Sequence, residues 1–243
     1  MRVRGTVAYE GTAFHGWAAQ PGLPTVQGVL EDALATVTGE AVSLTVAGRT
    51  DTGVHARAQV VSFDVADAGT DLARLRRSLD RLAGPDVAVC SLEEAEPDFS
   101  ARFSAKSRRY LYRYLTAAAA DPFRRRFAWH VRALDLDAMA AAVPPIVGEH
   151  DFAAFCKAGA HGGTVRRVAE ATVAPGPDGE VRFWVEAASF GHQMVRSLAG
   201  ALAAVGHGRR HPEWVRDLLD STDRAGIGNV APPHGLTLWD VRY

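Results

Sequence analysis

The sequence predicts an α+β protein of two tandem ferredoxin-like (RRM-like) halves, whose strands form a mixed, mainly antiparallel central sheet flanked by helices. Apolar residues in positions 1–102 follow the order strand, helix, strand, strand, helix, strand, which is the split β-α-β arrangement. The same order recurs in positions 103–243. The chain of 243 residues, with 47 % hydrophobic and 23 % charged residues, has the composition of a globular protein with a sizeable core.

The first half shows period-two alternation where strands are predicted and apolar stripes at helical spacing where helices are predicted. In chain order the elements are a strand at 3–9, a helix at 26–37, strands at 42–46 and 59–65, a helix at 72–82 and a strand at 87–92. Thr25 marks the start of the first helix, and Gly39 stops it. Gly84 and Pro85 end the second helix.

The second half begins with Tyr110, Tyr112 and Tyr114, which a period of two places on one face of a strand. The elements that follow are a helix at 134–147, strands at 164–174 and 181–188, a helix at 195–206, an extra helix around 214–219 and a closing strand at 236–243. We interpret Tyr112 and Tyr114 as core residues. Two such sheets joined edge to edge would leave a central cleft lined by sheet faces and loops.

The charges are unevenly distributed, although the net charge is only -1. Residues 102–132 carry nine basic residues against one acid, and residues 64–98 carry nine acids against four arginines. Arginine supplies 25 of the 27 basic residues, and its guanidinium group binds phosphate in a bidentate fork. A polyanionic partner is one interpretation, in which Arg124, Arg125 and Arg126 contact phosphate. A solvated basic surface is the other.

The most informative segment is AGRTDTGVHA at positions 47–56. Gly48 and Gly53 bracket its charged centre, and glycine permits the tight backbone path that would project Arg49 and Asp51 away from the sheet. An aspartate flanked by a cation is held ionised, as a carboxylate nucleophile requires. For the tetrapeptide GRTD alone, an Asx-turn aspartate in a surface salt bridge is the non-catalytic alternative.

Other features narrow the setting of the protein. The chain has no apolar run long enough to span a membrane and no apolar signal core after Met1, so we expect a cytoplasmic protein without a membrane partner. Cys90 and Cys156 show no CxxC spacing, which fits a reducing compartment. His207 and His211 have HxxxH spacing, but neighbouring glycines and a proline break the helix that would align them, so we predict no metal site.

Further motifs accompany the GRTD loop along the chain. They are YEGT at 9–12, GW at 16–17, TVQ at 25–27, ARFSA at 101–105, RRY at 108–110, DF at 151–152, TVRR at 164–167 and MVR at 194–196. In composition and order these motifs and the loop resemble the tRNA pseudouridine synthase A family. The resemblance extends from Val3 to Tyr243, which is essentially the whole chain.

This resemblance implies a pseudouridine synthase fold with a central cleft, and a cofactor-free, metal-free isomerase that converts uridine to pseudouridine at positions 38–40 in the anticodon stem-loop of tRNA. It implies that Asp51, in the half formed by residues 1–102, is the nucleophile. In the half formed by residues 103–243, Tyr110 would stack on the flipped base and remove its proton, and Arg196 would pair with Asp51. The residues implied to bind RNA are Tyr110, Arg49, His55, Arg102, Arg108, Arg109 and His192. Members of the family act as homodimers that hold one tRNA between two subunits.

The sequence departs from the family pattern at several positions. Ser197 stands where asparagine is common and Ala18 where glutamine is common, and the stretch 78–85 replaces an Asn-Ala-Leu-Pro-like segment. An arginine is common near His192, so we expect His192 or Gln193 to do its work.

Two other functions share some of these sequence features. A non-catalytic RNA-binding module built from RRM-like halves predicts aromatic RNP motifs, and the sequence has no RNP1-like run. A carboxylate-based glycosidase or nucleosidase needs a paired acid, and Asp51 has no acidic partner within its motif. Both therefore remain minor alternatives.

Overall fold

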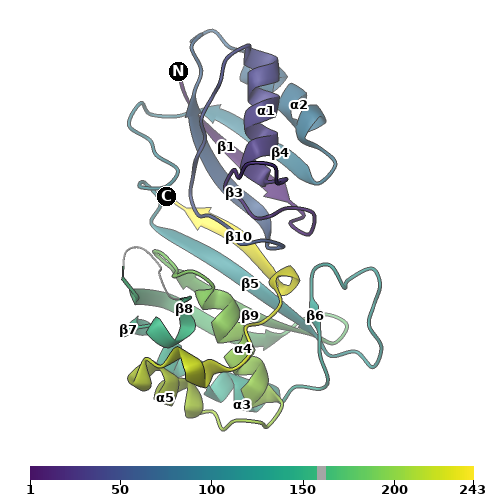
Figure 1. Cartoon of the computed structure of the whole chain (residues 1–243), viewed down its shortest axis with the longest axis vertical. Coiled ribbons are helices and arrows are strands. Elements are labelled where there is room, and N and C mark those ends of the chain that lie inside the picture. Colours follow the sequence, from purple (N-terminus) through teal and green to yellow (C-terminus); the bar gives the residue numbers. More distant parts are fainter. Residues whose placement is uncertain (158–162) are drawn as a thin grey trace. The chain divides into compact units, whose positions relative to one another are not determined.

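The computed structural model describes residues 1–157 and 163–243. The chain divides into two compact α+β units (Figure 1). The N-terminal unit comprises Met1–Lys106 together with Leu238–Tyr243, and the C-terminal unit comprises Ser107–Thr237. The predicted boundary lay after residue 102. In the structure the N-terminal unit extends to Lys106 and also contains the last six residues of the chain.

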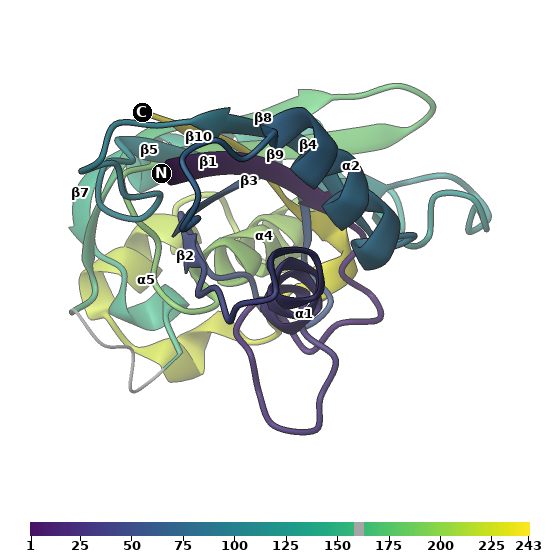
Figure 2. The ribbon, with the colours of Figure 1, turned by 90° about the horizontal axis from the view of Figure 1, so that it is seen from above.

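The N-terminal unit has the predicted order of elements. Its strands are β1 (Arg2–Tyr9), β2 (Thr45–Val46), β3 (His55–Asp64) and β4 (Val87–Glu94), and its helices are α1 (Val26–Thr38) and α2 (Leu72–Ala83). Strand β1 lies between β4 and β3 and is antiparallel to both, while β2 is antiparallel to β3. Figure 1 shows α1 and α2 in front of these strands, and Figure 2 shows α1 from its end, on one side of β1 and β3.

Local signals explain where these helices begin and end. The Thr25 hydroxyl accepts a hydrogen bond from the first turn of α1, and Gly39 ends that helix in the left-handed conformation. Asp71 caps α2 by accepting from the backbone N–H of Arg74 at 2.9 Å. Strand β2 is shorter than predicted because the Leu44 N–H donates to a glutamate of α1 rather than to a neighbouring strand.

The last strand, β10 (Leu236–Arg242), follows β3 in the order of the sheet. The N–H of Lys106 donates to the carbonyl of Arg242 at 2.8 Å, and the Tyr243 hydroxyl donates to the carbonyl of Ala101 at 2.8 Å. The Arg4 guanidinium lies 4.6 Å from the centroid of the Tyr243 ring. These contacts explain why the closing residues belong to the N-terminal unit.

The C-terminal unit contributes strands in the order β5-β9-β8-β7. Its strands are β5 (Ser107–Leu115), β6 (Trp129–His130), β7 (Gly148–Asp151), β8 (Val165–Pro175) and β9 (Glu180–Ala187), and its helices are α3 (Leu136–Ala141), α4 (Met194–Gly206) and α5 (Trp214–Ser221). Neighbouring strands of that order are antiparallel, whereas β6 is parallel to β5. The α+β class with mixed, mainly antiparallel pairing is therefore confirmed.

The predicted helix at 134–147 is wrong in its second half. Helix α3 ends at Ala141, and a 3-10 turn at Pro144–Ile146 and strand β7 follow it. Pro144 and Pro145 lack the N–H groups that would continue an α-helix. Helix α4 matches its prediction and is buried along nearly its whole length, so it forms the centre of the core of this unit.

Candidate active site

The loop that carries Asp51 is braced from beneath by a buried hydrogen-bond network. The Tyr9 and Thr50 hydroxyls lie 2.7 Å apart, and the Gln59 amide donates to the Tyr9 hydroxyl at 3.3 Å. The same amide donates to the Gly48 carbonyl at 2.6 Å. Burial raises the pKa of Tyr9 to about 12, so its hydroxyl keeps its proton at neutral pH. The network fixes the loop at residues on both sides of Arg49.

Close backbone packing holds the other side of this loop. The Trp17 N–H donates to the Thr50 carbonyl at 3.0 Å, and the Val54 N–H donates to the Asp51 carbonyl at 3.1 Å. Gly16 has φ of +89°, and a Cβ there would lie 2.8 Å from the Thr50 oxygen. Arg49 is exposed and Asp51 is half-buried. Hydrogen bonds and close packing therefore hold the loop backbone on both sides of these two charged residues.

His55, at the end of the same motif, is buried. Its side chain is only 2 % exposed, and its Nδ1 accepts a hydrogen bond from the Gly11 N–H at 2.8 Å. A Glu10 carboxylate oxygen lies 3.6 Å from the same nitrogen. A Cβ on Gly11 would lie 2.0 Å from the Val54 carbonyl oxygen, so only glycine allows this approach. The first position of β3 thus directs His55 into the interior, where it supports the loop. The RNA contact expected of His55 stays a prediction.

The three tyrosines of β5 lie on one face of the strand but in different surroundings. Tyr112 donates to the Pro232 carbonyl at 2.9 Å, and Tyr114 donates to the Ala199 carbonyl at 2.8 Å. Both are fully buried, which raises the pKa of each hydroxyl and confirms them as core residues. Tyr110 is 8 % exposed, and its ring meets the Phe190 ring edge to face with centroids 5.1 Å apart.

Arg196 lies in the first turn of α4, and the chain before β10 holds it by two bonds. Its Nε donates to the Ala231 carbonyl at 2.9 Å, and its own carbonyl accepts from the Ala231 N–H at 3.1 Å. This approach requires Gly200, where a Cβ would lie 2.3 Å from the Asn229 carbonyl oxygen. Burial and the Arg196 charge lower the pKa of His234, so that imidazole is neutral at pH 7. The Arg196 guanidinium is thus held in one direction, and the neighbouring His234 adds no positive charge beside it.

The other residues of the C-terminal half that are expected to bind RNA differ in how far they are exposed to solvent. Arg102 is exposed, with its guanidinium 5.1 Å from the Phe103 ring centroid, and His192 is also exposed. Arg109 stacks at 4.7 Å over Trp184 and is half-buried. Arg108 is buried, and its Nη1 donates to the Ala188 carbonyl at 2.6 Å. Arg108 therefore anchors the loop after β9, and its RNA contact stays a prediction.

Arg124 also differs from the expectation of a phosphate contact. Its Nη2 lies 2.7 Å from Glu180 Oε2 and its Nη1 donates to the Asp178 carbonyl at 3.1 Å. Its guanidinium is therefore held by the turn between β8 and β9. Its neighbours Arg125 and Arg126 are exposed.

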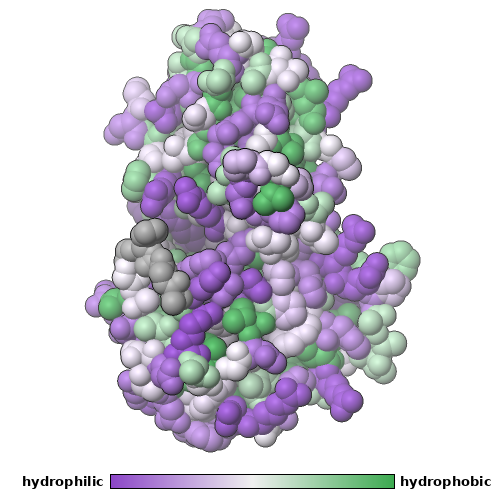
Figure 3. All heavy atoms as spheres, viewed as in Figure 1, coloured by the Kyte–Doolittle hydropathy of each residue, from purple (hydrophilic) through white to green (hydrophobic). Residues whose placement is uncertain are grey.

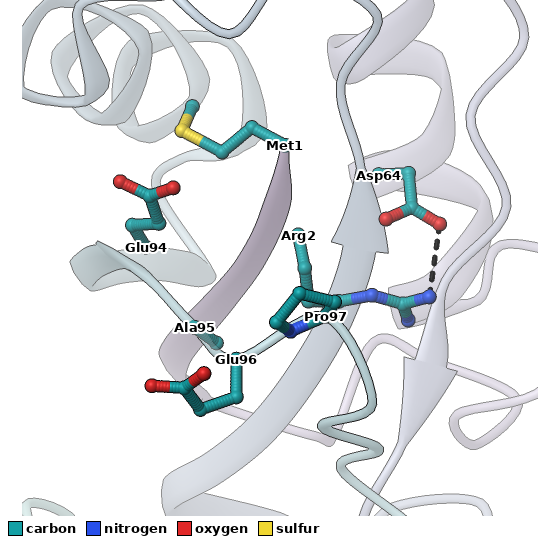
Figure 4. A pocket seen from close by; sticks show the side chains of 7 residues that line it. All are labelled: Met1, Arg2, Asp64, Glu94, Ala95, Glu96 and Pro97. Carbon is teal, nitrogen blue, oxygen red and sulfur yellow. Dashed lines mark ion pairs between the residues drawn. The ribbon is translucent and has the colours of Figure 1, made fainter.

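A hollow of about 620 Å³ in the N-terminal unit is not part of this machinery (Figure 4). Asp64, Glu94 and Glu96 line it, and Asp64 forms a 3.0 Å ion pair with Arg2. In the register of β1 and β3, Arg2 pairs with Asp64 at one end, whereas Tyr9 lies at the other. At about 3.4 Å per residue, the two ends are on the order of 20 Å apart. The acidic lining would also repel a polyanion.

Two further observations describe the parts of the chain that the structure covers. None of the helices within residues 1–157 and 163–243 is long and apolar enough to cross a bilayer. Over the same residues, no three histidine, cysteine or acidic side chains gather in a group suited to a metal ion. His211, one member of the HxxxH pair, lies with its Nδ1 3.2 Å from Glu213.

The sequence does not predict which residues, distant along the chain, support the candidate site residues. Tyr9 of β1 bonds Thr50, and Gln59 of β3 bonds Tyr9 and Gly48. The Phe190 ring contacts the Tyr110 ring across 80 positions of the chain. Phe190 lies in a loop, where periodicity carries no signal. Tyr9 belongs to a strand whose alternation predicts burial but not a hydrogen bond.

Comparison with known proteins places the chain among RNA-modifying isomerases. A family model described as tRNA pseudouridine synthase matches residues 6–104 and 142–243. The match defines the class as an enzyme that isomerises uridine in RNA to pseudouridine.

Relatives called tRNA pseudouridine synthase A cover the whole chain. The identity is 50 % with the relative from Frankia casuarinae, with 100 % of this chain and 89 % of the relative covered. It is 48 % with the relative from Streptomyces avermitilis, covering 100 % and 88 %, and 41 % with that from Brevibacillus brevis, covering 100 % and 99 %. The chain belongs to the tRNA pseudouridine synthase A family, and its activity is the pseudouridylation of tRNA.

Proposed function

We propose that this enzyme isomerises uridine in the anticodon stem-loop of tRNA, at positions 38–40, with Asp51 as nucleophile and without a cofactor. The observation that carries the proposal is the construction of the GRTD loop. Tyr9, Gln59 and Gly16 fix its backbone from beneath, while Asp51 remains half-buried at its surface. Such a preorganised carboxylate is what a nucleophilic step requires.

The reaction itself needs no external reactant. The C1′–N1 bond breaks, the base turns, and a C1′–C5 bond forms. The proton on C5 leaves and N1 gains a proton, so atoms and electrons balance within the isomerisation. Asp51 serves this course by attacking C1′ or C6, or by assisting a glycal path. Each course requires the uridine to leave its stack.

Tyr110 and Arg196 complete the proposed machinery. Tyr110 stacks on the flipped uracil and removes the C5 proton, and the Phe190 ring supports its orientation. Arg196 pairs with the Asp51 carboxylate. Within its own unit, the Arg196 Nε donates to the Ala231 carbonyl, which holds the guanidinium in position.

The remaining proposals concern RNA binding and assembly. Arg49, Arg102 and His192 contact RNA, because each is exposed on its own unit, and Arg109 adds a half-buried cation. The enzyme acts in the cytoplasm as a homodimer that holds one tRNA. Sedimentation of the purified protein with and without tRNA tests the assembly.

The decisive experiment measures tritium release to water from tRNA transcripts labelled at uridine C5, in the presence of a chelator. The native protein should release tritium, and Asp51→Asn should release none while binding tRNA with nearly native affinity. Asp64→Asn is the matched control, because it makes the same change at the far end of β3 and should retain turnover. Transcripts with cytidine at positions 38–40 should release only background tritium.

Each result decides a separate part of the proposal. Turnover by Asp51→Asn would remove Asp51 as nucleophile. Loss of native activity in chelator that returns with a metal ion would overturn the cofactor-free reaction. Release from the cytidine-substituted transcripts would move the target uridines away from positions 38–40.

A further inference from the structure

The segment at 116–128, between β5 and β6, extends away from the strands of the C-terminal unit (Figure 1). Its Phe123 is 91 % exposed, which makes it the most exposed large hydrophobic side chain of the described residues. In Figure 3, hydrophilic and hydrophobic residues lie next to each other at this edge of the molecule. A fully exposed ring contributes little to the core, so folding alone does not explain it.

This segment is anchored although it forms no helix or strand. Both the N–H and the hydroxyl of Thr116 donate to the Gly179 carbonyl, at 2.9 and 2.8 Å. The His130 Nε2 lies 2.9 Å from the Ala117 carbonyl. Arg124 bonds the same β8–β9 turn, as described above. The Phe123 N–H is also engaged, donating to an aspartate oxygen at 2.8 Å. Phe123 therefore extends from a framework tied down at three places.

The electrostatic setting of the segment favours an anionic partner. The Glu180 carboxylate is 7 % exposed and accepts from Arg182 at 2.6 Å as well as from Arg124. The Glu180 charge also acts on Arg113, whose pKa burial lowers. One buried carboxylate thus faces three guanidinium groups. Together with Arg125 these three arginines make four positive charges. The acids of the region make three negative charges, those of Glu180 and the aspartates at 121 and 178.

We propose that the segment 116–128 is an RNA-docking surface, on which Phe123 stacks against an unpaired base and Arg125 and Arg126 contact the adjacent phosphates. An exposed aromatic ring beside arginines is the arrangement that binds single-stranded nucleic acid, because every base has a face to stack and every nucleotide a phosphate. The inference rests on the proposed function, because it takes tRNA as the partner. It assigns to the segment 116–128 a contact with tRNA that is separate from the residues proposed to carry out the reaction.

The test compares Phe123→Ala, Phe123→Leu and Phe123→Trp in tRNA affinity, measured by fluorescence anisotropy of labelled tRNA at two salt concentrations. Alanine and leucine should each weaken binding about tenfold, and tryptophan should restore it, because only an aromatic ring stacks on a base. Leu82→Ala is the matched control, since it truncates another exposed apolar residue, on α2, and should bind like the native protein.

The double variant Arg125→Gln with Arg126→Gln should weaken binding and reduce the salt dependence of affinity, whereas the Phe123 variants should leave that dependence unchanged. Thermal melting by circular dichroism checks that every variant folds. Native affinity in Phe123→Ala would overturn the proposal.

A second copy of this chain is the other candidate occupant of the segment. Sedimentation of Phe123→Ala decides this point, because a change of oligomeric state without tRNA would assign the segment to a protein interface and overturn the RNA contact. If the native protein neither binds nor turns over tRNA, the proposed function fails as a whole. If the native protein does both and Phe123→Ala equals it, only the docking surface fails.

Discussion

Replacing Tyr9 by phenylalanine tests whether the buried network under the GRTD loop positions Asp51. The substitution keeps the ring and removes one hydroxyl, which lies 2.7 Å from Thr50 Oγ1 and accepts a hydrogen bond from Gln59. Thr50 is buried, so its hydroxyl would lose its partner with no water to replace it. The GRTD loop would then lack one of the hydrogen bonds that hold its backbone.

The cost follows from the geometry of this network. A buried hydroxyl left without its partner destabilises a protein by about 1–3 kcal/mol. For a chain of this length, each kcal/mol lowers Tm by about 2–4 °C, so a loss of about 2 kcal/mol lowers Tm by about 4–8 °C. If the network also fixes the carboxylate, a small displacement of Asp51 should reduce the rate of the chemical step by about tenfold or more.

Tyr114→Phe provides the matched control for this prediction. It also removes a buried hydroxyl with a 2.8 Å hydrogen bond, but that bond supports α4 in the other unit. Both variants should lose similar stability in thermal melting. In single-turnover tritium release well below Tm, Tyr9→Phe should be slow and Tyr114→Phe close to native. Equal rates in the two variants would refute a positioning role for Tyr9.

Three more predictions follow from the structure. Because the pKa of Tyr9 is about 12 in the folded chain against about 10 unfolded, its stabilising contribution is complete below pH 10 and is lost by pH 12. The Tm difference between the native protein and Tyr9→Phe should therefore narrow over that range, and a constant difference would contradict it. Gly200→Ala should lower turnover strongly, since its Cβ would lie 2.3 Å from a carbonyl of the segment that holds Arg196, and native kinetics would show that this segment is dispensable. A thiol reagent should modify the exposed Cys90 in the native protein and the buried Cys156, whose pKa burial raises, only after unfolding; two fast thiols would contradict the packing.

Most of the secondary structure follows from local signals. Thr25 and Gly39 delimit α1 as predicted, because a side-chain cap and a left-handed glycine act within a few residues of the chain. The prediction of a helix to position 147 is wrong because the apolar spacing continues through Pro144 and Pro145, where the backbone forms a 3-10 turn. Proline removes a hydrogen-bond donor whatever the surrounding pattern, so it should have ended the prediction.

The sequence predicts the charged residues of the candidate site, but it does not predict the residues that support the GRTD loop. A short motif between two glycines singles out Asp51 and Arg49. In the structure Arg49 is exposed and Asp51 is half-buried. His55 belongs to the same motif, yet its position at the start of β3 points it inward. Membership of a motif therefore does not separate an exposed side chain from a buried one that supports the loop. Burial separates them, and burial depends on contacts distant in sequence.

The glycines near the motifs carry as much of the argument as the charged residues. Gly11 and Gly16 let the segment after β1 approach the GRTD loop, where a Cβ would lie within 2.8 Å of a backbone oxygen. Gly200 lets the segment before β10 reach Arg196 in the same way. Backbone cannot yield as a flexible side chain can, so alanine at any of the three must displace a segment that holds a functional residue. A substitution scan of this enzyme should therefore find these glycines as intolerant as Asp51 itself, although none of them can take part in the chemistry.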